Sequence, residues 1–143
     1  MTQHPFVVVG IDGSQASVEA LRWAGRYAQS IDAEVRVLTA FDVPWTIYIT
    51  PTSTDSYYME RAEAMLAESV SRAFPAFPPV PVHETVLQGR PALALVGAAH
   101  GAALLVVGAT GHSALPGMHI GSVAGFCVHH APCPVLVWRP PSD

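Results

Sequence analysis

Short runs rich in β-branched residues alternate with helix-type segments along this chain, and this alternation restricts the possible folds most. The first run, residues 6–11 (FVVVGI), suits a strand that is buried on both faces, as strands of parallel sheets are. Comparable runs cover residues 35–41, 104–107 and 134–138, and a shorter alternating run covers residues 82–86. Strands that alternate with helices in this way predict a parallel sheet with helices on both faces.

Four helical segments are expected between these runs. The first has apolar residues at helical spacing, and Ser14 or Ser17 is expected to cap it. The second begins near residues 55–56, and the third follows Pro91, because proline suits the first turn of a helix. The fourth covers residues 122–130. One face of the third helix is shared by Leu93, Val96, Gly97 and His100.

The elements therefore follow the order βαβαβαβαβ within one domain that covers residues 1–143. Right-handed crossovers leave few topologies, and we expect the strand order 3-2-1-4-5. This arrangement is a doubly wound, Rossmann-like α/β fold, in which the crossovers diverge between the first and fourth strands. Ligands of such sheets bind beyond the carboxyl ends of the strands at this switch point. The rule selects the turn Asp12-Gly13-Ser14 and the loop that begins at Gly108.

The composition argues against several classes of protein. The net charge is −4, and all seven cationic residues are arginines scattered along the chain, so no basic stripe predicts nucleic-acid binding. The first residues lack the pattern of a signal peptide, and the longest apolar run, residues 102–107, is far too short to span a bilayer. The two cysteines suit a reducing compartment better than a disulfide framework. We therefore expect a cytoplasmic protein without nucleic-acid or membrane partners.

The loop after the fourth expected strand is punctuated by glycines. Gly108 and Gly111 stand three residues apart, and Gly121-Ser122 opens the fourth helix. Glycine permits the backbone to approach a ligand closely. Free N–H groups in such a loop can cradle an anion, and the first amides and the dipole of the helix favour phosphate oxygens. The pattern predicts a phosphate-binding loop.

The spacing of these residues resembles the motif G-x2-G-x9-G-S/T of the nucleotide-binding members of the universal stress protein family. The likeness extends to VVVGIDGS near the start, LLVVG before the loop and HAPCPVLVWRP near the end. It therefore covers essentially the whole chain. The resemblance implies a role in stress response and an adenine nucleotide as the ligand: ATP, with Mg²⁺ accompanying it, or AMP or cyclic AMP.

The resemblance assigns parts of the nucleotide to particular residues. Asp12 would hydrogen-bond the adenosine moiety, and Ala40 and Val107 would line the adenine slot. Backbone amides would hold the ribose and phosphates at Gly108, Gly111, Gly121, Ser122 and Val123. The other residues expected at the site are Gly10, Ile11, Gly13, Ser14 and His112. Gly10 stands where some members have a proline, which implies a looser adenine slot.

The last expected strand is a candidate for joining two copies of the chain. The resemblance implies a homodimer in which this strand pairs with its counterpart across a two-fold axis. The strand residues concerned are Val135, Leu136, Val137 and Trp138. The physical argument points the same way, because an open sheet edge rich in Val, Leu and Trp is a liability unless it is paired.

Several alternatives stay open at this point. One is a sensor or sink for cyclic AMP, and another is an interaction module without nucleotide, in which Asp12 and the glycines serve only as turn and loop residues. Cys127 and His130 could share a helix face, but a zinc site needs further ligands. The chain has no lysine for a P-loop, and no nucleophile with a base stands out. We expect binding, with slow ATP hydrolysis at most, and name no catalytic or metal-ligating residue.

Overall fold

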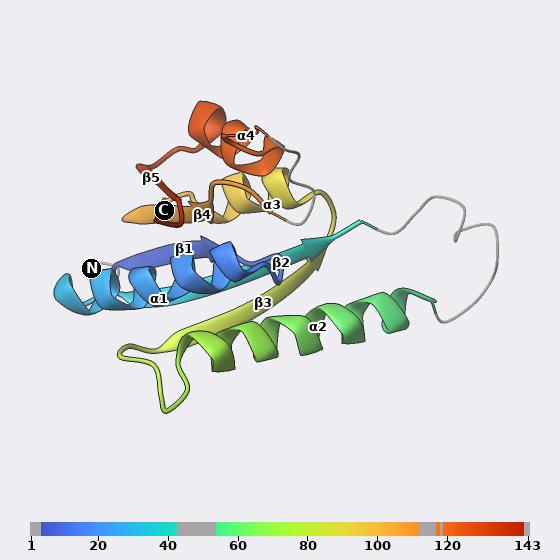
Figure 1. Ribbon diagram of the computed structural model, residues 1–143, viewed down its shortest axis with the longest axis horizontal. Coiled ribbons are helices and arrows are strands. Elements are labelled where there is room, and N and C mark those ends of the chain that lie inside the picture. Colours follow the sequence, from blue (N-terminus) through green and yellow to red (C-terminus); the bar gives the residue numbers. More distant parts are fainter. Residues whose placement is uncertain (1–3, 43–53, 112–116, 118, 142–143) are drawn as a thin grey trace.

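The computed structural model describes residues 4–42, 54–111, 117 and 119–141, and strands and helices alternate along it (Figure 1). The elements in chain order are β1 (Phe6–Gly10), α1 (Gln15–Ser30), β2 (Glu34–Phe41), α2 (Thr54–Ala73), β3 (Val82–Gln88), α3 (Pro91–Ala98), β4 (Leu104–Gly108), α4 (Ser122–His130) and β5 (Val135–Trp138). Within the described ranges, no helix combines the length and the apolar character that crossing a bilayer would need. The expected order βαβαβαβαβ is confirmed.

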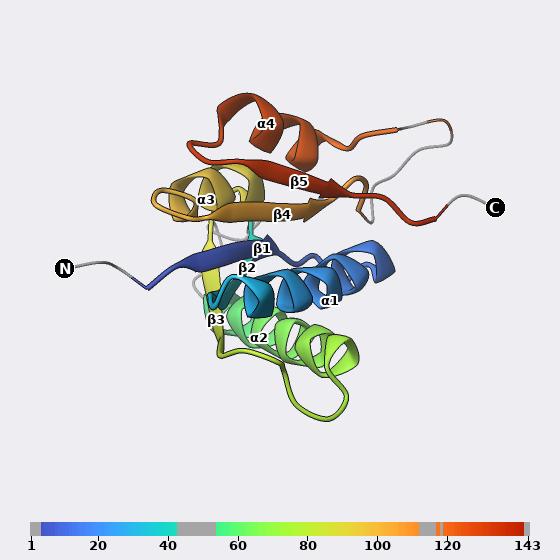
Figure 2. The same ribbon diagram turned by 90° about the vertical axis from the view of Figure 1, so that its left-hand side faces the viewer.

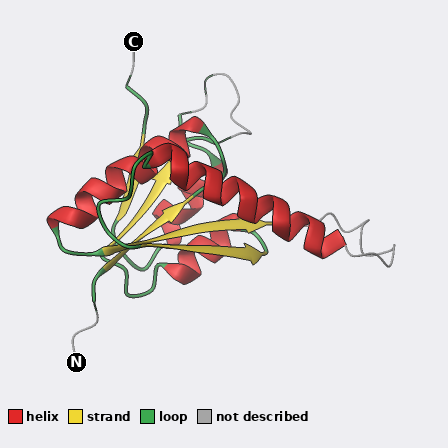
Figure 3. Ribbon diagram, turned by 90° about the horizontal axis from the view of Figure 1, so that it is seen from below, coloured by secondary structure: helices red, strands yellow, loops and turns green. Residues whose placement is uncertain are grey.

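The strands form one parallel sheet in the order β3-β2-β1-β4-β5, which confirms the doubly wound α/β fold. β1 is central and pairs with β2 on one side and with β4 on the other. Helices α1 and α2 cover one face of the sheet, and α3 and α4 cover the other (Figure 2). The strands fan out as the sheet twists (Figure 3). The crossovers therefore diverge between β1 and β4, as predicted.

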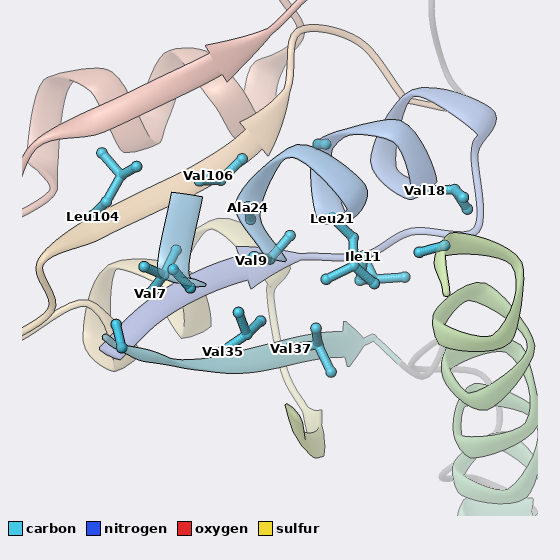
Figure 4. Close-up of a cluster of buried hydrophobic side chains, with 14 of the residues drawn as sticks. Val7, Val9, Ile11, Val18, Leu21, Ala24, Val35, Val37, Leu104 and Val106 are labelled. Atoms are coloured by element: carbon cyan, nitrogen blue, oxygen red, sulfur yellow. The ribbon is translucent and has the colours of Figure 1, made fainter. Parts of the chain in front are cut away.

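β1 supplies side chains to two separate hydrophobic cores, because successive residues of a strand point to opposite faces. Val7 and Val9 are completely buried under α1, in one core with Leu21 and Ala24 (Figure 4). Val8 is equally inaccessible but belongs to the core under α3 and α4. A strand that is apolar on both faces is stable only between two layers of helices, which explains why this run becomes the centre of the sheet.

The helix ends lie where the capping residues predicted them, with one choice resolved. Ser14 caps α1, and its hydroxyl accepts a hydrogen bond from the amide of Ser17 at 3.2 Å. Ser17 itself lies inside the helix and is buried. Pro91 is the first residue of α3, and α4 covers the predicted residues 122–130. The Ser14 cap and the proline at the first turn therefore explain where α1 and α3 begin.

The helical spacing of α3 did not identify the face that packs on the sheet, and His100 lies beyond the end of the helix. Leu93 is 51% exposed, whereas Leu95 is 4% exposed and packs in the second core. The helix sequence PALALVGA is apolar all round, so its spacing could not identify the face that packs on the sheet.

α1 and α2 approach each other closely at Gly25. A Cβ added there would lie 2.7 Å from the ring of Phe74 and 3.3 Å from Pro79. Phe74 follows the end of α2 and packs against the first core, so its ring has little room to move. Arg22 fastens the same corner, because its Nε donates to the carbonyl of Ala73 at 3.2 Å and so satisfies one of the last carbonyls of α2.

We expect Gly25→Ala to destabilise the protein, although alanine favours a helix. Overpacking against Phe74 costs about 1–3 kcal/mol, which exceeds the roughly 1 kcal/mol that alanine gains over glycine inside a helix. Gly125→Ala is the matched control in α4, because nothing lies within 4 Å of its added Cβ, and it should stabilise the protein. Urea unfolding measures both free energies, and equal stabilisation by the two substitutions would contradict the tight packing at Gly25.

A charged cluster joins the beginnings of β2 and β3. Glu34 Oε1 accepts from Arg36 Nε at 3.0 Å, and Glu34 Oε2 lies 3.2 Å from His83 Nε2. The Arg36 guanidinium also lies over the ring of Phe6, 3.6 Å from its centroid. Burial raises the pKa of Glu34, but the hydrogen bonds and charges of Arg36 and His83 outweigh burial, and the net pKa is lower than usual. The ionised carboxylate therefore stabilises this edge of the fold.

We expect Glu34→Gln to lower the free energy of unfolding at neutral pH. The pKa of Glu34 is lowered in the folded protein, so the ionised carboxylate contributes fully to the free energy of unfolding above the ordinary carboxyl pKa of about 4.3. This contribution is lost as the pH falls through the lower pKa of the folded state. The difference in the free energy of unfolding between the wild type and Glu34→Gln should therefore become smaller at acidic pH. Glu84→Gln on β3 is the control, since Glu84 makes no ion pair with the described residues. Urea unfolding at a series of pH values measures the deficit, and one that is independent of pH would refute the ion-pair account.

Candidate functional site

A cavity of about 320 Å³ opens beyond the carboxyl ends of β1 and β4, at the switch point of the sheet. The topology predicted a ligand at this place. The volume is in the range of small-molecule sites. Its walls come from the ends of β1, β2 and β4, from the starts of α1, α3 and α4, and from the glycine-rich loop that links β4 to α4.

The structure brings most of the expected site residues together around this cavity. Those that line it are Gly10, Ile11, Asp12, Ser14, Ala40, Val107, Gly108, Gly111, Gly121, Ser122 and Val123. Gly13 is not among the lining residues. Its φ of 84° lies in the left-handed region that favours glycine, and it turns the chain between Asp12 and Ser14. His112 lies outside the described residues.

The carboxylate of Asp12 is anchored to the start of α1. Its Oδ1 accepts a hydrogen bond from the amide of Ser14 at 2.9 Å and another from Ser14 Oγ at 2.5 Å. The dipole of α1 also favours a negative charge at this end of the helix. Among the described residues, none donates a hydrogen bond to the second oxygen, Oδ2. The anchoring therefore orients Asp12 and leaves Oδ2 without a donor among the described residues.

The glycine-rich loop passes directly beside this carboxylate. A Cβ added at Gly111 would overlap Oδ2 of Asp12, so no side chain fits at position 111 unless the carboxylate moves. The glycine allows two segments that are far apart in sequence to form one wall of the cavity. This close approach is a physical reason for the second glycine of the motif.

Backbone hydrogen bonds close the loop at its base. The amide of Gly121 donates to the carbonyl of Ala109 at 2.5 Å, and α4 begins immediately afterwards with Gly121 as its N-cap. The first amides of a helix have no partner within the helix, and Ser122 and Val123 both line the cavity. An anion placed there would meet free N–H groups and the positive end of the helix dipole.

Another part of the cavity is apolar. Its lining includes Leu38 and Ala40 from β2, Val107 from β4, and Pro91 and Leu95 from α3. Aliphatic walls of this kind suit a flat, largely apolar ring.

Leu95 takes up the space that Gly10 leaves beside β1. A Cβ at Gly10 would lie 2.8 Å from Leu95 Cδ1, so the glycine is what lets the leucine reach the end of the strand. Glycine in place of proline at position 10 implied a looser adenine slot, and the side chain of Leu95 fills the space beside this glycine.

Sequence reasoning missed part of the lining. The missed residues are Ser17, Leu38, Pro91, Leu95, Ala109, Thr110 and Ala124. Leu38 stands two residues before Ala40 and therefore shares its face of β2. Pro91 begins the helix that follows β3, and Leu95 lies one turn further on. These positions follow from the topology once the strand ends are placed, so they could have been found by extending each predicted segment by one turn or one alternation.

The charges of the site restrict its chemistry. Asp12 is the one ionisable side chain among the described lining residues. In the described part of the chain, no group of three His, Cys, Asp or Glu side chains could hold a metal ion. Burial, with a smaller contribution from Cys133, raises the pKa of Cys127 to about 11, so this thiol is protonated near neutral pH and is a poor metal ligand. The arrangement can bind a molecule that has a flat ring, a hydrogen-bonding group for Asp12 and an anionic end.

Comparisons with solved structures show the same fold. Universal stress protein UspA from Lactobacillus plantarum has a TM-score of 0.79 at 22% identity, covering 97% of this chain and 100% of that one. A universal stress protein in complex with cAMP has a TM-score of 0.70 at 31% identity, covering 98% and 100%. A universal stress protein from Archaeoglobus fulgidus in complex with dAMP has a TM-score of 0.69 at 22% identity, covering 96% and 99%.

Sequence comparisons identify the family. A universal stress protein of Mycobacterium tuberculosis is 36% identical over 137 residues, which are 96% of this chain and 46% of that protein. This chain thus spans about half the length of the curated relatives that it matches. Residues 6–139 match the universal stress protein family as a whole. With its fold, its switch-point cavity and this match, the chain belongs to the universal stress protein family.

Proposed function

We propose that this protein binds an adenine nucleotide in the cavity between β1 and β4 and acts in stress response as a dimeric, nucleotide-dependent binding module. The observation that carries the proposal is that an apolar slot, the oriented carboxylate of Asp12 and the free amides of α4 surround one cavity. An adenine nucleotide has matching parts: a flat ring, a hydroxylated sugar and a phosphate. The relative in complex with cAMP, at 31% identity, supports this class of ligand.

Each part of the nucleotide has a place in the proposed complex. The adenine ring lies against Ala40 and Val107, and Asp12 accepts a hydrogen bond from the adenosine moiety through Oδ2. Ribose and phosphates lie along the amides of Gly108, Gly111, Gly121, Ser122 and Val123. A phosphate contact from His112 remains a prediction, because that residue lies outside the described part of the chain.

ATP and cyclic AMP make different demands on this site. The described lining carries no cationic side chain, so a triphosphate needs its charge neutralised from elsewhere, and we expect Mg²⁺ to accompany ATP. Cyclic AMP and AMP carry less charge, which backbone amides and a helix dipole can balance. The cAMP complex of the relative favours cyclic AMP as the alternative ligand, in which case the protein is a sensor or sink for it.

The proposed homodimer uses the edge of the sheet at β5. This strand pairs only with β4, so its other side is open within the described chain. Its residues Val135, Leu136, Val137 and Trp138 are all only partly buried. A second copy paired along this edge would cover an apolar strand that is otherwise prone to aggregation. A cytoplasmic location and the lack of nucleic-acid or membrane partners remain predictions from composition.

Calorimetric titration of the stripped protein tests the nucleotide proposal. The ligands are Mg-ATP, AMP and cyclic AMP, with GMP as the matched control for the base. We expect micromolar binding of at least one adenine nucleotide and weaker binding of GMP. A ligand at a hundredfold excess over its Kd should also stabilise the fold by about 2.7 kcal/mol, which a thermal shift detects. Failure of all three adenine nucleotides to bind would leave only the interaction-module alternative.

We expect Gly121→Val to weaken binding of the same nucleotide by at least tenfold while the protein stays folded. Gly121 has φ −80° and ψ 172°, an extended conformation that valine adopts readily. An added Cβ would lie 3.4 Å from the carbonyl oxygen of Ala109 and 3.6 Å from Cα of Thr110, both in the loop. The valine methyl groups would therefore crowd Ala109 and Thr110, which line the cavity beside the start of α4. Gly97→Val is the matched control on α3, where an added Cβ meets nothing within 4 Å, and it should bind like the wild type. Normal nucleotide binding by folded Gly121→Val would show that the loop does not hold the phosphates.

A further inference from the structure

We infer that Arg139 is a positioning residue for phosphate binding, which holds the far end of the glycine-rich loop in place from outside the cavity. The inference rests on the proposed function, because it concerns the same cavity. Arg139 follows directly after β5, is exposed, and is not among the residues that line the cavity. It therefore acts through the loop and does not touch the ligand.

Two consecutive residues at the end of β5 hold the two ends of the loop: Trp138, the last residue of the strand, and Arg139, which follows it. The carbonyl of Trp138 accepts from the amide of Ala109 at 2.7 Å, at the start of the loop. The guanidinium of Arg139 donates from Nη1 to the carbonyl of His119 at 2.7 Å, near its end. Since the amide of Gly121 also donates to the carbonyl of Ala109 at 2.5 Å, the start and the end are joined to each other. These three hydrogen bonds form a closed frame at the base of the loop.

The far end of the loop gains little from burial. His119 is exposed, and Ile120 is 40% exposed although it is a large apolar residue. Fixing the backbone of such a segment costs conformational entropy, which directional contacts must offset. A hydrogen bond from a charged donor is among the stronger contacts available. The bond from Arg139 is thus a main restraint on the segment that leads into α4.

Arg139 is anchored to a rigid part of the fold. The preceding residue, Trp138, pairs with Gly108 across the sheet, and its ring packs against the first core. The indole Nε1 of Trp138 also donates to Glu19 Oε2 on α1 at 3.3 Å. The sheet therefore fixes the backbone from which the Arg139 side chain reaches the loop.

Such a role affects one part of the ligand selectively. The segment that Arg139 holds leads into the amides of Ser122 and Val123, which the proposed complex assigns to the phosphate. Adenosine is assigned instead to Asp12 and to the apolar slot. Loss of the bond should therefore weaken the binding of AMP and spare that of adenosine, whereas a general structural defect would weaken both.

Calorimetric titration of Arg139→Gln with AMP and with adenosine tests this inference. We expect about tenfold weaker binding of AMP, the effect of one hydrogen bond to a charged group, and a change of less than about twofold for adenosine. Arg26→Gln is the matched control, because this substitution removes the same charge. Arg26 is exposed on α1 and makes no hydrogen bond with the described residues. It should bind both ligands like the wild type. The loss should persist in about 1 M salt, where the Debye length is only about 3 Å.

Four outcomes would overturn the inference. Unchanged AMP affinity in Arg139→Gln would show that the bond is not needed, and an equal loss for AMP and adenosine would indicate general damage. A loss that vanishes in high salt would indicate a long-range effect of charge. A wild-type protein that binds neither AMP, ATP nor cyclic AMP would overturn the proposed function itself, and the inference with it.

Arg139→Lys keeps the test decisive if Arg139→Gln does not fold. Lysine retains the charge but lacks the planar fork of the guanidinium, so its bond to the loop carbonyl is less well fixed. We expect about threefold weaker AMP binding with adenosine binding unchanged, a value between the wild type and Arg139→Gln. AMP affinity equal to that of the wild type, when Arg139→Gln is unfolded, would mean that charge alone matters and would overturn the inference.

Discussion

Burial of β1 on both faces is the constraint on which the rest of the structure depends. Val7 and Val9 fill one core and Val8 fills the other, so a layer of helices is needed on each side of the sheet. A chain that must place helices on both faces has to reverse its direction of winding once. It does so between β1 and β4, and the crossovers leave the cavity there. The site is therefore a consequence of how the core is covered.

The sequence carried enough information for the strand order and for most of the cavity. Strand-type runs rich in β-branched residues, the proline that opens α3 and the serine that caps α1 placed the elements, and the switch-point rule then placed the site. Asp12 and Gly111 were both expected at the site, but their close approach to each other was not predicted. That contact depends on how closely the loop approaches the turn after β1, and a one-dimensional pattern contains no such distance.

The parts that the sequence did not reveal have a common cause. Helix α3 is apolar on every side, so the burial of Leu95 and the exposure of Leu93 follow only from where the helix lies on the sheet. The role of Leu95 beside Gly10 likewise needs the distance between α3 and β1. The bond from Arg139 to the carbonyl of His119 joins a side chain to a backbone group, and such bonds leave no trace in residue type.

The position of β4 in the chain has a consequence for synthesis. A ribosome delivers β1, α1, β2, α2 and β3 first, and domains can begin to fold as they emerge. Until β4 appears, one edge of β1 has no partner strand, and the wall of the cavity that α4 provides does not yet exist. A nascent or prematurely terminated chain therefore offers no pocket to a small molecule. Any ligand of this cavity selects chains that extend through α4 over shorter fragments, and it stabilises only those chains.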